Sequence, residues 1–380
     1  MQLKEFGKNG AYDKTLAQDV LLMISPNPPE RFRGIARFAA EHGWYLSIED
    51  RSSPPAEFSG DGVIVTLGRQ HTALKRAVET YLKRGIPVVD LTFQHPEVAV
   101  NRVIGDNEAI GRLAAEHFKD HNFHHAAFFA SHRGNVQRLR RSAFERAWEG
   151  EVLSLAGLTR AELAARLIEM PKPIAVFAYS DYDATRVLNA CRDAKLVVPD
   201  EVAILGVDDN VPICENQPVP ISSIRHDHET VGYEGAALLN RLMSATKKPR
   251  KAAPLKLIAP KGVAVRRSTD VLATGDPFVR QAIDLINLNI SQNLTQRKLS
   301  EELKITEADL NARFRRELGC SPVRQIIALR LTQVKRLLTS TDYPLEAIAA
   351  ETGFCHAAHL ANAFRSAFGI TPGEWRRLKQ

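Results

Sequence analysis

The sequence predicts two domains of different class: a two-lobed α/β domain with parallel sheets, followed by an all-α domain of two helix-turn-helix units. Three observations predict this. Short apolar runs alternate with amphipathic helical patterns in the first two thirds of the chain, the pattern becomes entirely helical from Phe278 onward, and the C-terminal part nearly repeats itself. The expected boundaries are 1–267 for the first domain, 268–277 for a linker and 278–380 for the second domain.

Composition is that of an ordinary globular chain. It has 380 residues, 44% of them hydrophobic and 25% charged, which is enough chain for two or three domains. Its 4 cysteines include no C-x-x-C pair, so neither a zinc ribbon nor a disulfide framework is indicated. With no secretory leader and no apolar run long enough to cross a bilayer, we expect a cytoplasmic protein without membrane contact.

The first domain is expected to contain buried parallel strands, because six runs are apolar on both faces and rich in β-branched residues. The runs are Val20–Ile24, Gly62–Thr66, Pro87–Leu91, Ala126–Ala130, Ile174–Tyr179 and Val202–Val207. Helical patterns lie between them, at Arg33–His42, Leu74–Arg84, Glu108–Asp120 and Ala184–Ala194. Alternation of strand and helix implies right-handed βαβ crossovers. Two lobes with a cleft between them accommodate this length of chain better than one oversized sheet.

The polar stretch Arg266–Pro277 has Gly and Pro but no period, which is typical of a linker. Beyond it the chain repeats itself at an offset of fifty positions. Leu310, Phe314, Arg315, Leu318, Gly319, Ser321 and Pro322 are matched by Leu360, Phe364, Arg365, Phe368, Gly369, Thr371 and Pro372. One supersecondary unit is therefore used twice. In each copy a Gly ends a helix and a Ser-Pro or Thr-Pro pair begins the next, with Thr371 and Glu374 forming a capping box.

Each copy also predicts a helix-turn-helix. A short helix, Gln296–Leu303 or Leu345–Thr352, precedes a tight turn and the repeated helix, a shape that sets the second helix into the major groove. The helix between the copies, Pro322 to about Ser340, is roughly 27 Å long, which suits two reading heads about one DNA turn apart. Residues 278–380 hold 15 Lys and Arg against 10 Asp and Glu, most of the net charge of +7.

Helical spacing selects the residues that face DNA. With Leu310 and Phe314 inward, the opposite face carries Ala308, Asn311, Ala312 and Arg315; in the second copy it carries Ala358, Ala361, Asn362 and Arg365, with His356 at the helix start. Asn pairs with adenine and Arg with guanine, while alanines allow close approach. Arg315 and Arg365 could equally hold phosphates. The alternative is a small packing domain whose charges only solvate it.

The string Ile348-Ala349-x-x-Thr352-Gly353-Phe354, then Phe364-Arg365-x-x-Phe368-Gly369-x-Thr371-Pro372, resembles the signature of AraC-type transcription regulators, with Trp375 where the family usually has Tyr. The resemblance covers about 100 residues of the chain. It implies that the DNA-facing residues are Ala308, Asn311 and Ala312 in the first unit and Ala357, Ala358, Ala361 and Asn362 in the second.

The front part is similar to the effector-binding core of LacI/GalR-type regulators. The segments that carry the resemblance include Gly105-Asp106-Asn107, Arg138-Leu139-Arg140, Ser180-Asp181 and Ala203-Ile204-Leu205-Gly206-Val207-Asp208-Asp209-Asn210. The resemblance implies that Arg138 and Asp208 bind ligand hydroxyls, with Asp106, Asp181 and His226 as further candidates. The Asp residues stand just past strand ends, where an open α/β sheet presents its ligand crevice. Asp and Arg there can hydrogen-bond vicinal hydroxyls. The alternative is that Asp208 and Asp209 only cap or turn the chain.

A LacI-like sensor followed by an AraC-type domain is the arrangement of xylose operon regulators, to which the chain is similar along nearly its whole length. The resemblance implies a sugar-responsive DNA-binding transcription regulator that activates a pentose (xylose-like) utilisation operon without a cofactor or metal. Its expected partners are double-stranded DNA with direct-repeat half-sites, a monosaccharide such as xylose, a second copy of the chain and RNA polymerase.

Three alternatives stay open: a repressor or a regulator of another sugar, a front domain that serves only as a dimerisation scaffold, and a sugar-modifying enzyme. Phosphate-cradling, nucleophile-elbow and metal-spaced His motifs are missing from the sequence, so we expect no enzyme.

Overall fold

The computed structural model describes residues 18–25, 28–68, 72–245, 255–292 and 294–379; the N-terminal stretch considered above lies largely outside them. Contacts divide the chain into two units, Met1–Val271 and Leu272–Gln380, called here the N-terminal and the C-terminal unit. The division falls within the expected linker, 268–277. Ser268 and Thr269 are buried in the N-terminal unit, where their hydroxyls donate to the Ile204 carbonyl and the Ser222 hydroxyl. The polar side chains at the start of the expected linker therefore form buried hydrogen bonds within the N-terminal unit.

The N-terminal unit has two lobes, each built on one sheet, as the sequence predicts. Lobe 1 has the strand order β11-β5-β4-β3-β1-β2, with every pair parallel. Its elements are β1 (Asp19–Met23), α1 (Pro29–His42), β2 (Tyr45–Ile48), β3 (Gly62–Val65), α2 (Thr72–Lys83), β4 (Val88–Asp90), β5 (Asn101–Gly105), α8 (His228–Met243) and β11 (Lys256–Ile258). Alternate strand residues face α1 and α8 on one side and α2 on the other, so both faces are apolar.

Lobe 2 has the order β12-β10-β9-β8-β6-β7, parallel except for the antiparallel pair of β10 and β12. Its elements are α3 (Asn107–Asp120), β6 (His125–Phe129), α4 (Asn135–Ala147), β7 (Val152–Ser154), α5 (Arg160–Glu169), β8 (Ile174–Ala178), α6 (Asp181–Asp193), β9 (Val202–Val207), α7 (Val211–Glu215), β10 (Ser222–Ile224), β12 (Val263–Ala264) and the 3-10 turn η1 (Arg267–Thr269). Helices α5 and α6 cover one face. On the other, Phe118 and Phe144 pack toward Phe177.

Within its described residues, the N-terminal unit passes between the lobes three times. The crossings follow β5 at Asp106, β10 at residues 225–227 and β11 at residues 259–262. Backbone hydrogen bonds join the crossings side by side. Asp106 N donates to Ile258 O, Arg225 N donates to Gly262 O, and Lys261 N donates to Arg225 O. Three adjacent connections of this kind form a hinge. The polar residues next to them lie where the lobes meet.

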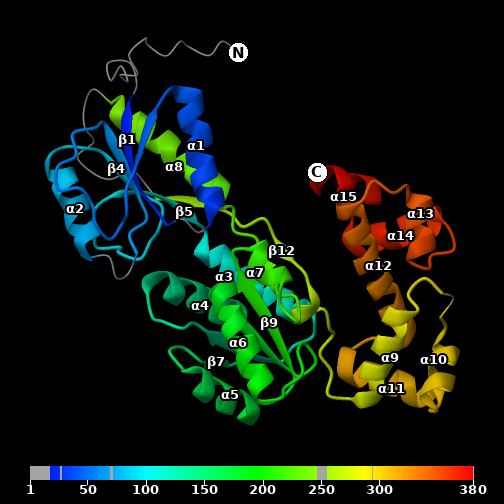
Figure 1. Ribbon diagram of the computed structural model, residues 1–380. Coiled ribbons are helices and arrows are strands. Elements are labelled where there is room, and N and C mark those ends of the chain that lie inside the picture. The colour runs from blue at the N-terminus through cyan, green and yellow to red at the C-terminus, as the bar shows by residue number, and fades with distance from the viewer. Residues whose placement is uncertain (1–17, 26–27, 69–71, 246–254, 293, 380) are drawn as a thin grey trace. The chain divides into compact units, whose positions relative to one another are not determined.

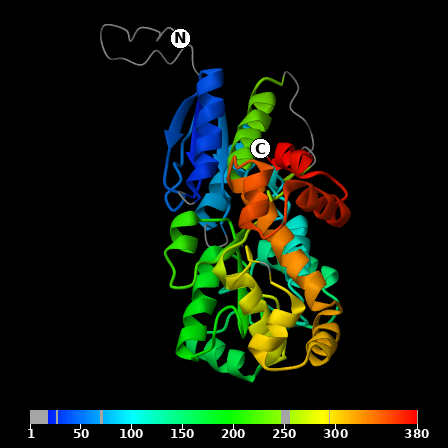
Figure 2. The same ribbon diagram turned by 90° about the vertical axis from the view of Figure 1, so that its right-hand side faces the viewer.

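Helices α1 and α8 pack closely because glycines stand at their crossing; the two lie side by side on lobe 1 in Figures 1 and 2 although they are far apart in sequence. A Cβ on Gly34 would overlap the Glu229 carbonyl, and a Cβ on Gly232 would overlap the Arg31 carbonyl. The contact places the first turns of both helices, and with them Arg31 and His228, at the boundary with lobe 2.

The C-terminal unit is entirely helical among its described residues, and it confirms the expected repeat. Its helices are α9 (Pro277–Leu288), α10 (Gln296–Leu303), α11 (Glu307–Leu318), α12 (Pro322–Ser340), α13 (Leu345–Glu351), α14 (Ala357–Phe368) and α15 (Pro372–Lys379). Two separate cores form around the matched pairs Leu310 with Phe314 and Leu360 with Phe364. The predicted capping box of Thr371 and Glu374 is present.

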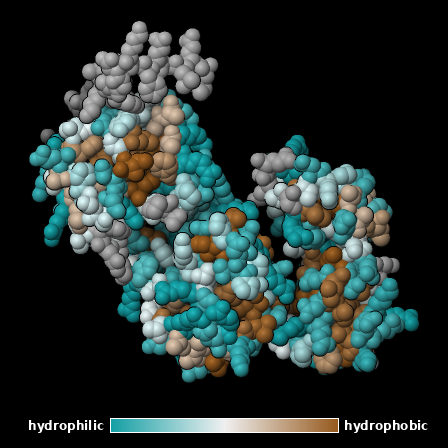
Figure 3. All heavy atoms as spheres, in the orientation of Figure 1, coloured by the Kyte–Doolittle hydropathy of each residue, from teal (hydrophilic) through white to brown (hydrophobic). Residues whose placement is uncertain are grey.

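Figure 3 shows hydrophobic atoms at the surface of the C-terminal unit among mainly hydrophilic ones; its exposed apolar side chains include Leu288 and Val323. Among the described residues of both units, no helix is long and apolar enough to cross a membrane.

Replacing Gly232 by Ala is expected to force α1 and α8 apart and to lower the free energy of unfolding by about 1–3 kcal/mol, the usual cost of overpacking against unyielding backbone. Urea unfolding followed by circular dichroism measures this. G373A is the control, because Gly373 lies in helix α15 with open space around its Cα. There Ala should be neutral or slightly stabilising. Equal stability of wild type and G232A would contradict the close crossing.

Candidate functional site: an inter-lobe cleft and two exposed recognition helices

A buried chain of polar side chains joins the two lobes. Arg31, in the first turn of α1, lies 3.1 Å through Nη2 from Nδ1 of His228, and His228 Nε2 lies 3.1 Å from Oδ1 of Asp208. Arg31 and His228 belong to lobe 1, whereas Asp208 follows β9 of lobe 2. A guanidinium only donates, so Nδ1 of His228 must accept and Nε2 carries the proton given to Asp208. The imidazole is therefore neutral, since burial and the charges of Arg31 and Arg140 hold the pKa of His228 well below its usual range.

His226 lies on one of the hinge crossings and stacks on His228, with ring centroids 3.8 Å apart. Its ring fills the space over Gly105, where any Cβ would overlap it. Burial first, and then the neighbouring His228, lower the pKa of His226. The structure thus places this expected ligand residue beside His228, against the hinge.

Asp208 and Asp209 both have positive φ values, 110° and 52°, at the end of β9. Such backbone is costly for residues other than Gly and is found mainly where function requires it. The turn directs Asp208 toward His228. Asp209 forms ion pairs with Arg225 and Arg266 on the far side of the turn, so the two neighbours have separate tasks.

Arg140, not Arg138, is the arginine of α4 that lies among the buried groups. Arg140 is 5% exposed and donates to Asn107 Oδ1 at 2.9 Å and to the Tyr179 carbonyl at 2.6 Å. Arg138 is exposed and bonds Asn135 one turn away. The two arginines differ in burial because residues two apart on a helix point in different directions, and ligand contact of Arg138 stays a prediction.

The remaining two candidates are engaged within lobe 2. Asp106 is the N-cap of α3, accepting from the backbone of Glu108 and Ala109. Asp181, 1% exposed, accepts from the Ser223 hydroxyl at 2.6 Å and from Asn210 N at 2.7 Å. Burial and the nearby charge of Asp208 raise the pKa of Asp181 to about 7. Asp181 is therefore a partly protonated group beside Asp208 near neutral pH.

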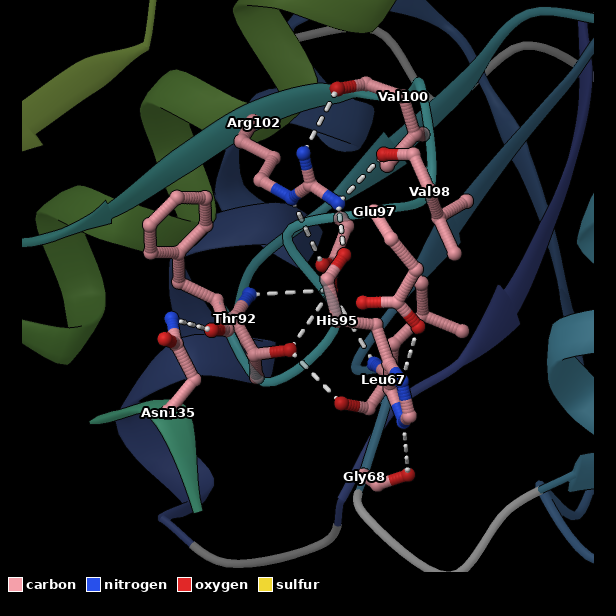
Figure 4. Close-up of polar contacts among 11 residues, drawn as sticks. Leu67, Gly68, Thr92, His95, Glu97, Val98, Val100, Arg102 and Asn135 are labelled. Atoms are coloured by element: carbon pink, nitrogen blue, oxygen red, sulfur yellow. Dashed lines mark hydrogen bonds and ion pairs between the residues drawn. The ribbon is translucent and has the colours of Figure 1, made fainter. Parts of the chain in front are cut away.

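Arg102 bonds several groups of the loop that follows β4, as Figure 4 shows. The guanidinium donates to Asp90 Oδ2 and to the carbonyls of His95 and Val98. Burial raises the pKa of Asp90 to about 6, against the hydrogen bonds from Leu67 and Thr92 and the charge of Arg102. One arginine thus fixes the path of a whole loop of lobe 1.

That loop also bonds lobe 2. Asn135, at the start of α4, donates to the Phe93 carbonyl at 2.6 Å, a contact that Figure 4 includes. Gln94 Oε1 accepts from the backbone N–H of Asn135 at 3.1 Å. The N-cap position of α4 is Gly134, which has no side chain to satisfy that amide, so Gln94 caps the helix from the other lobe. The lobes are therefore joined on both sides of the polar cluster.

In the C-terminal unit, the second helix of each pair presents its expected face to solvent. Ala308, Ala312, Arg315, His356, Ala358, Asn362 and Arg365 are exposed, and Asn311, Ala357 and Ala361 are partly exposed. Thr306 caps α11, and His356 caps α14 through its ring nitrogen, so His356 precedes the helix. The exposed faces match the sequence prediction, while contact of these residues with DNA stays a prediction.

Asp276 fastens the start of the C-terminal unit to α11. Its side chain is 4% exposed, caps α9, and accepts from Arg313 and Arg316 at 2.8 and 2.7 Å. Thr274 and the Gly275 amide bond Glu317 on the same helix. These arginines were not among the expected DNA contacts, and their pairing with Asp276 keeps them on the side of α11 that meets the incoming chain.

Three residues of the cleft, Arg31, Arg140 and His228, were missed by sequence reasoning. Arg140 had a signal: it shares the spacing of the apolar residues Val136, Ala143 and Phe144, which are buried on the inner face of α4. Arg31 and His228 had none, because they are 197 positions apart and meet only through the crossing of α1 and α8.

Comparisons with known proteins agree with this architecture. Residues 115–269 match a periplasmic binding protein-like domain, and residues 299–378 match a helix-turn-helix domain. The chain is 25% identical to the xylose operon regulatory protein of Escherichia coli K12, over 98% of this chain and 95% of that protein. The chain is therefore similar to the xylose operon regulatory proteins. It carries a periplasmic binding protein-like domain ahead of a helix-turn-helix domain.

Further relatives support the same assignment. The xylose operon regulatory protein of Haemophilus influenzae is 27% identical over 57% of this chain and 55% of its own length. Among solved structures, a xylose-binding transcription activator covers 96% of this chain and 99% of its own with a TM-score of 0.60 and 23% identity. A LacI family regulator from Mycobacterium smegmatis covers 67% of this chain and 100% of its own, with a TM-score of 0.55 and 18% identity. These structures confirm the two-lobed fold of the N-terminal unit of this chain.

Replacing Asp181 by Asn is expected to change how stability depends on pH. The folded-state pKa of about 7 lies above the ordinary value of 3.8, so the folded protein binds the proton more tightly and the carboxyl group's stabilising contribution is lost as pH rises toward 7. Relative to D181N, the free energy of unfolding of the wild type should fall by up to about 1.4 kcal/mol for each unit by which pH rises toward 7. Chemical unfolding from pH 5 to 8 measures the difference.

D193N is the control for this series. The Arg160 guanidinium lowers the pKa of the exposed Asp193, so this group stays ionised throughout the range and its replacement should add no slope. A constant difference between wild type and D181N would show that Asp181 is ionised throughout.

Proposed function

We propose that this protein is a sugar-responsive DNA-binding transcription regulator that binds a monosaccharide between the lobes of its N-terminal unit. The observation that carries the proposal is the chain Arg31, His228, Asp208, which spans both lobes in a protein that also has two exposed recognition helices. Charged and amide groups that converge in a cleft at the ends of sheet strands suit the directional hydroxyls of a sugar. The names of its relatives favour a pentose such as xylose and a role as activator.

The proposed mechanism couples ligand to lobe arrangement. The sugar binds Arg31 and His228 on one side and Asp208 and Arg140 on the other. It therefore stabilises the arrangement of the lobes in which all four residues reach it. Such a ligand shifts the equilibrium only by its different affinity for the two arrangements. The change reaches the C-terminal unit through the chain that leads from Thr269 to Asp276.

For DNA, the proposal assigns base contact to Asn311 and Asn362 and close approach to the alanines Ala308, Ala312, Ala357, Ala358 and Ala361. Arg315, Arg365 and His356 bind phosphates or bases at the rim. The two helix-turn-helix pairs of the C-terminal unit then bind direct-repeat half-sites in successive major grooves. We also propose a cytoplasmic homodimer that contacts RNA polymerase, with dimer contacts in the N-terminal unit, where the edge strand β2 exposes Tyr45 and Ile48.

Replacing Arg140 by Ala is expected to weaken binding of the best sugar by ten- to a hundredfold, because a charge-assisted hydrogen bond contributes about 1.5–3 kcal/mol. Thermal shift with a panel of pentoses and hexoses, followed by calorimetry, measures this. R138A is the matched control, since Arg138 lies two residues away and faces solvent. Loss of sugar binding in R138A, with binding retained in R140A, would contradict the assignment of Arg140 to the sugar site.

Sugar is expected to tighten operator binding, and operator must then tighten sugar binding by the same factor. Fluorescence anisotropy with fragments of the promoter regions adjoining the gene gives both affinities. The affinity for DNA should fall steeply with salt, because phosphate contacts release counterions.

The double variant R315A/R365A should lower the slope of log affinity against log salt by about 0.9 for each phosphate that the variant no longer neutralises. R192A removes an equally exposed arginine from the N-terminal unit and should leave the slope unchanged. A protein that binds no DNA at low salt, with or without sugar, refutes the proposed function.

A further inference from the structure

Three arginines converge on the cleft. Arg31 is 8% exposed and Arg140 is 5% exposed. Arg51, just past β2, donates to the buried Thr66 hydroxyl at the end of β3. Burial is the largest cause that lowers the pKa of Arg31; the charges of Asp208 and Asp90 act in the opposite direction, and the charge of Arg51 adds to the lowering. Positive charge is therefore concentrated at this place from both lobes.

None of the three forms an ion pair with a carboxylate among the described residues. Arg31 contacts a neutral imidazole, Arg140 an amide and a carbonyl oxygen, and Arg51 a hydroxyl. The Nε atom of Arg31 is buried and has no hydrogen-bond partner in the described part of the chain. Burying a guanidinium without a partner for each N–H is costly, so these groups are arranged for something that the chain itself does not supply.

The carboxylates near them are too few to balance the charge. Asp208 accepts a hydrogen bond from His228 and is the carboxylate, among the described residues, that bonds this chain of polar groups. Asp181 is partly protonated, and Asp90 is bound by Arg102. The excess is felt at both histidines: after burial, the charges of Arg31 and Arg140 are among the causes that lower the pKa of His228 and of His226.

Resting on the proposed function, we propose that the effector is an anionic monosaccharide, a sugar that carries a carboxylate or phosphate group bound by Arg31 and Arg51. The planar guanidinium fork matches both anions. Arg140 and Asp208, on the side of lobe 2, then bind the hydroxyls. A neutral sugar fills the same hydroxyl positions but leaves two guanidiniums of lobe 1 without a counter-charge.

The test compares matched pairs of ligands on the full-length protein by calorimetry at low ionic strength. The pairs are D-xylose with D-xylonate, D-galactose with D-galacturonate, and D-glucose with D-gluconate and with glucose 6-phosphate; the last two distinguish carboxylate from phosphate. In at least one pair the anionic member should bind more than tenfold tighter. Acetate and inorganic phosphate serve as anions without a sugar, and they should bind far more weakly.

The variant R31Q removes the charge, and it should weaken binding of the anionic sugar at least tenfold more than binding of the neutral sugar, so that the preference for the anion is lost. R33Q is the matched control, because Arg33 lies on the same helix with a side chain 61% exposed. Should R31Q fail to fold, R51Q makes the same test at a less buried arginine.

Equal or tighter binding of the neutral member in every pair overturns the inference and leaves the sugar-sensing function intact. Equal binding of inorganic phosphate and the sugar phosphate overturns it as well, since the site would then recognise an anion alone. If no sugar of either kind binds, the proposed function falls with it.

Discussion

A neutral histidine between an arginine and a carboxylate is the interaction on which the N-terminal unit depends. Arg31 cannot accept a hydrogen bond and Asp208 cannot donate one, so His228 must do both, and it does so only as the neutral tautomer that its buried surroundings enforce. Because Arg31 and His228 belong to one lobe and Asp208 to the other, the lobes are joined through a group that has no net charge. A ligand that offers both donors and acceptors can take over these contacts on either side of the imidazole.

The rest of the N-terminal unit supports that arrangement from outside the cluster. The glycines at the crossing of α1 and α8 bring Arg31 and His228 together, and the strained turn at Asp208 directs the carboxylate toward them. On another side, Gln94 supplies the cap that α4 lacks. The same helix bears Arg140, so the loop organised by Arg102 helps to position a cleft residue it never touches.

In the C-terminal unit, comparable contacts fix the positions of the two helix pairs. Asp276 binds two arginines of α11, so the entering chain is attached directly to that helix. Arg330 of α12 donates to the carbonyls of Ile290 and Gln292, and Gly353, in the turn of the second pair, packs against both its guanidinium and Ile290. The turn of the second pair therefore contacts the segment between α9 and α10 directly as well as through Arg330 of α12. Both ties use buried or half-buried charged side chains whose geometry is specific.

The sequence alone determined the fold class, the two helix pairs and the exposed faces of α11 and α14, because each rests on local periodicity and on caps within a few residues. It missed short strands such as β5 and β10, which lack a long apolar run. It named Arg138 and did not single out the buried Arg140, because a motif was followed instead of the helical period. What only the tertiary structure decided is the group of polar side chains that joins the lobes. Arg31, His228 and Asp208 come from distant segments, and their meeting depends on helix crossing and hinge geometry, which no local pattern encodes.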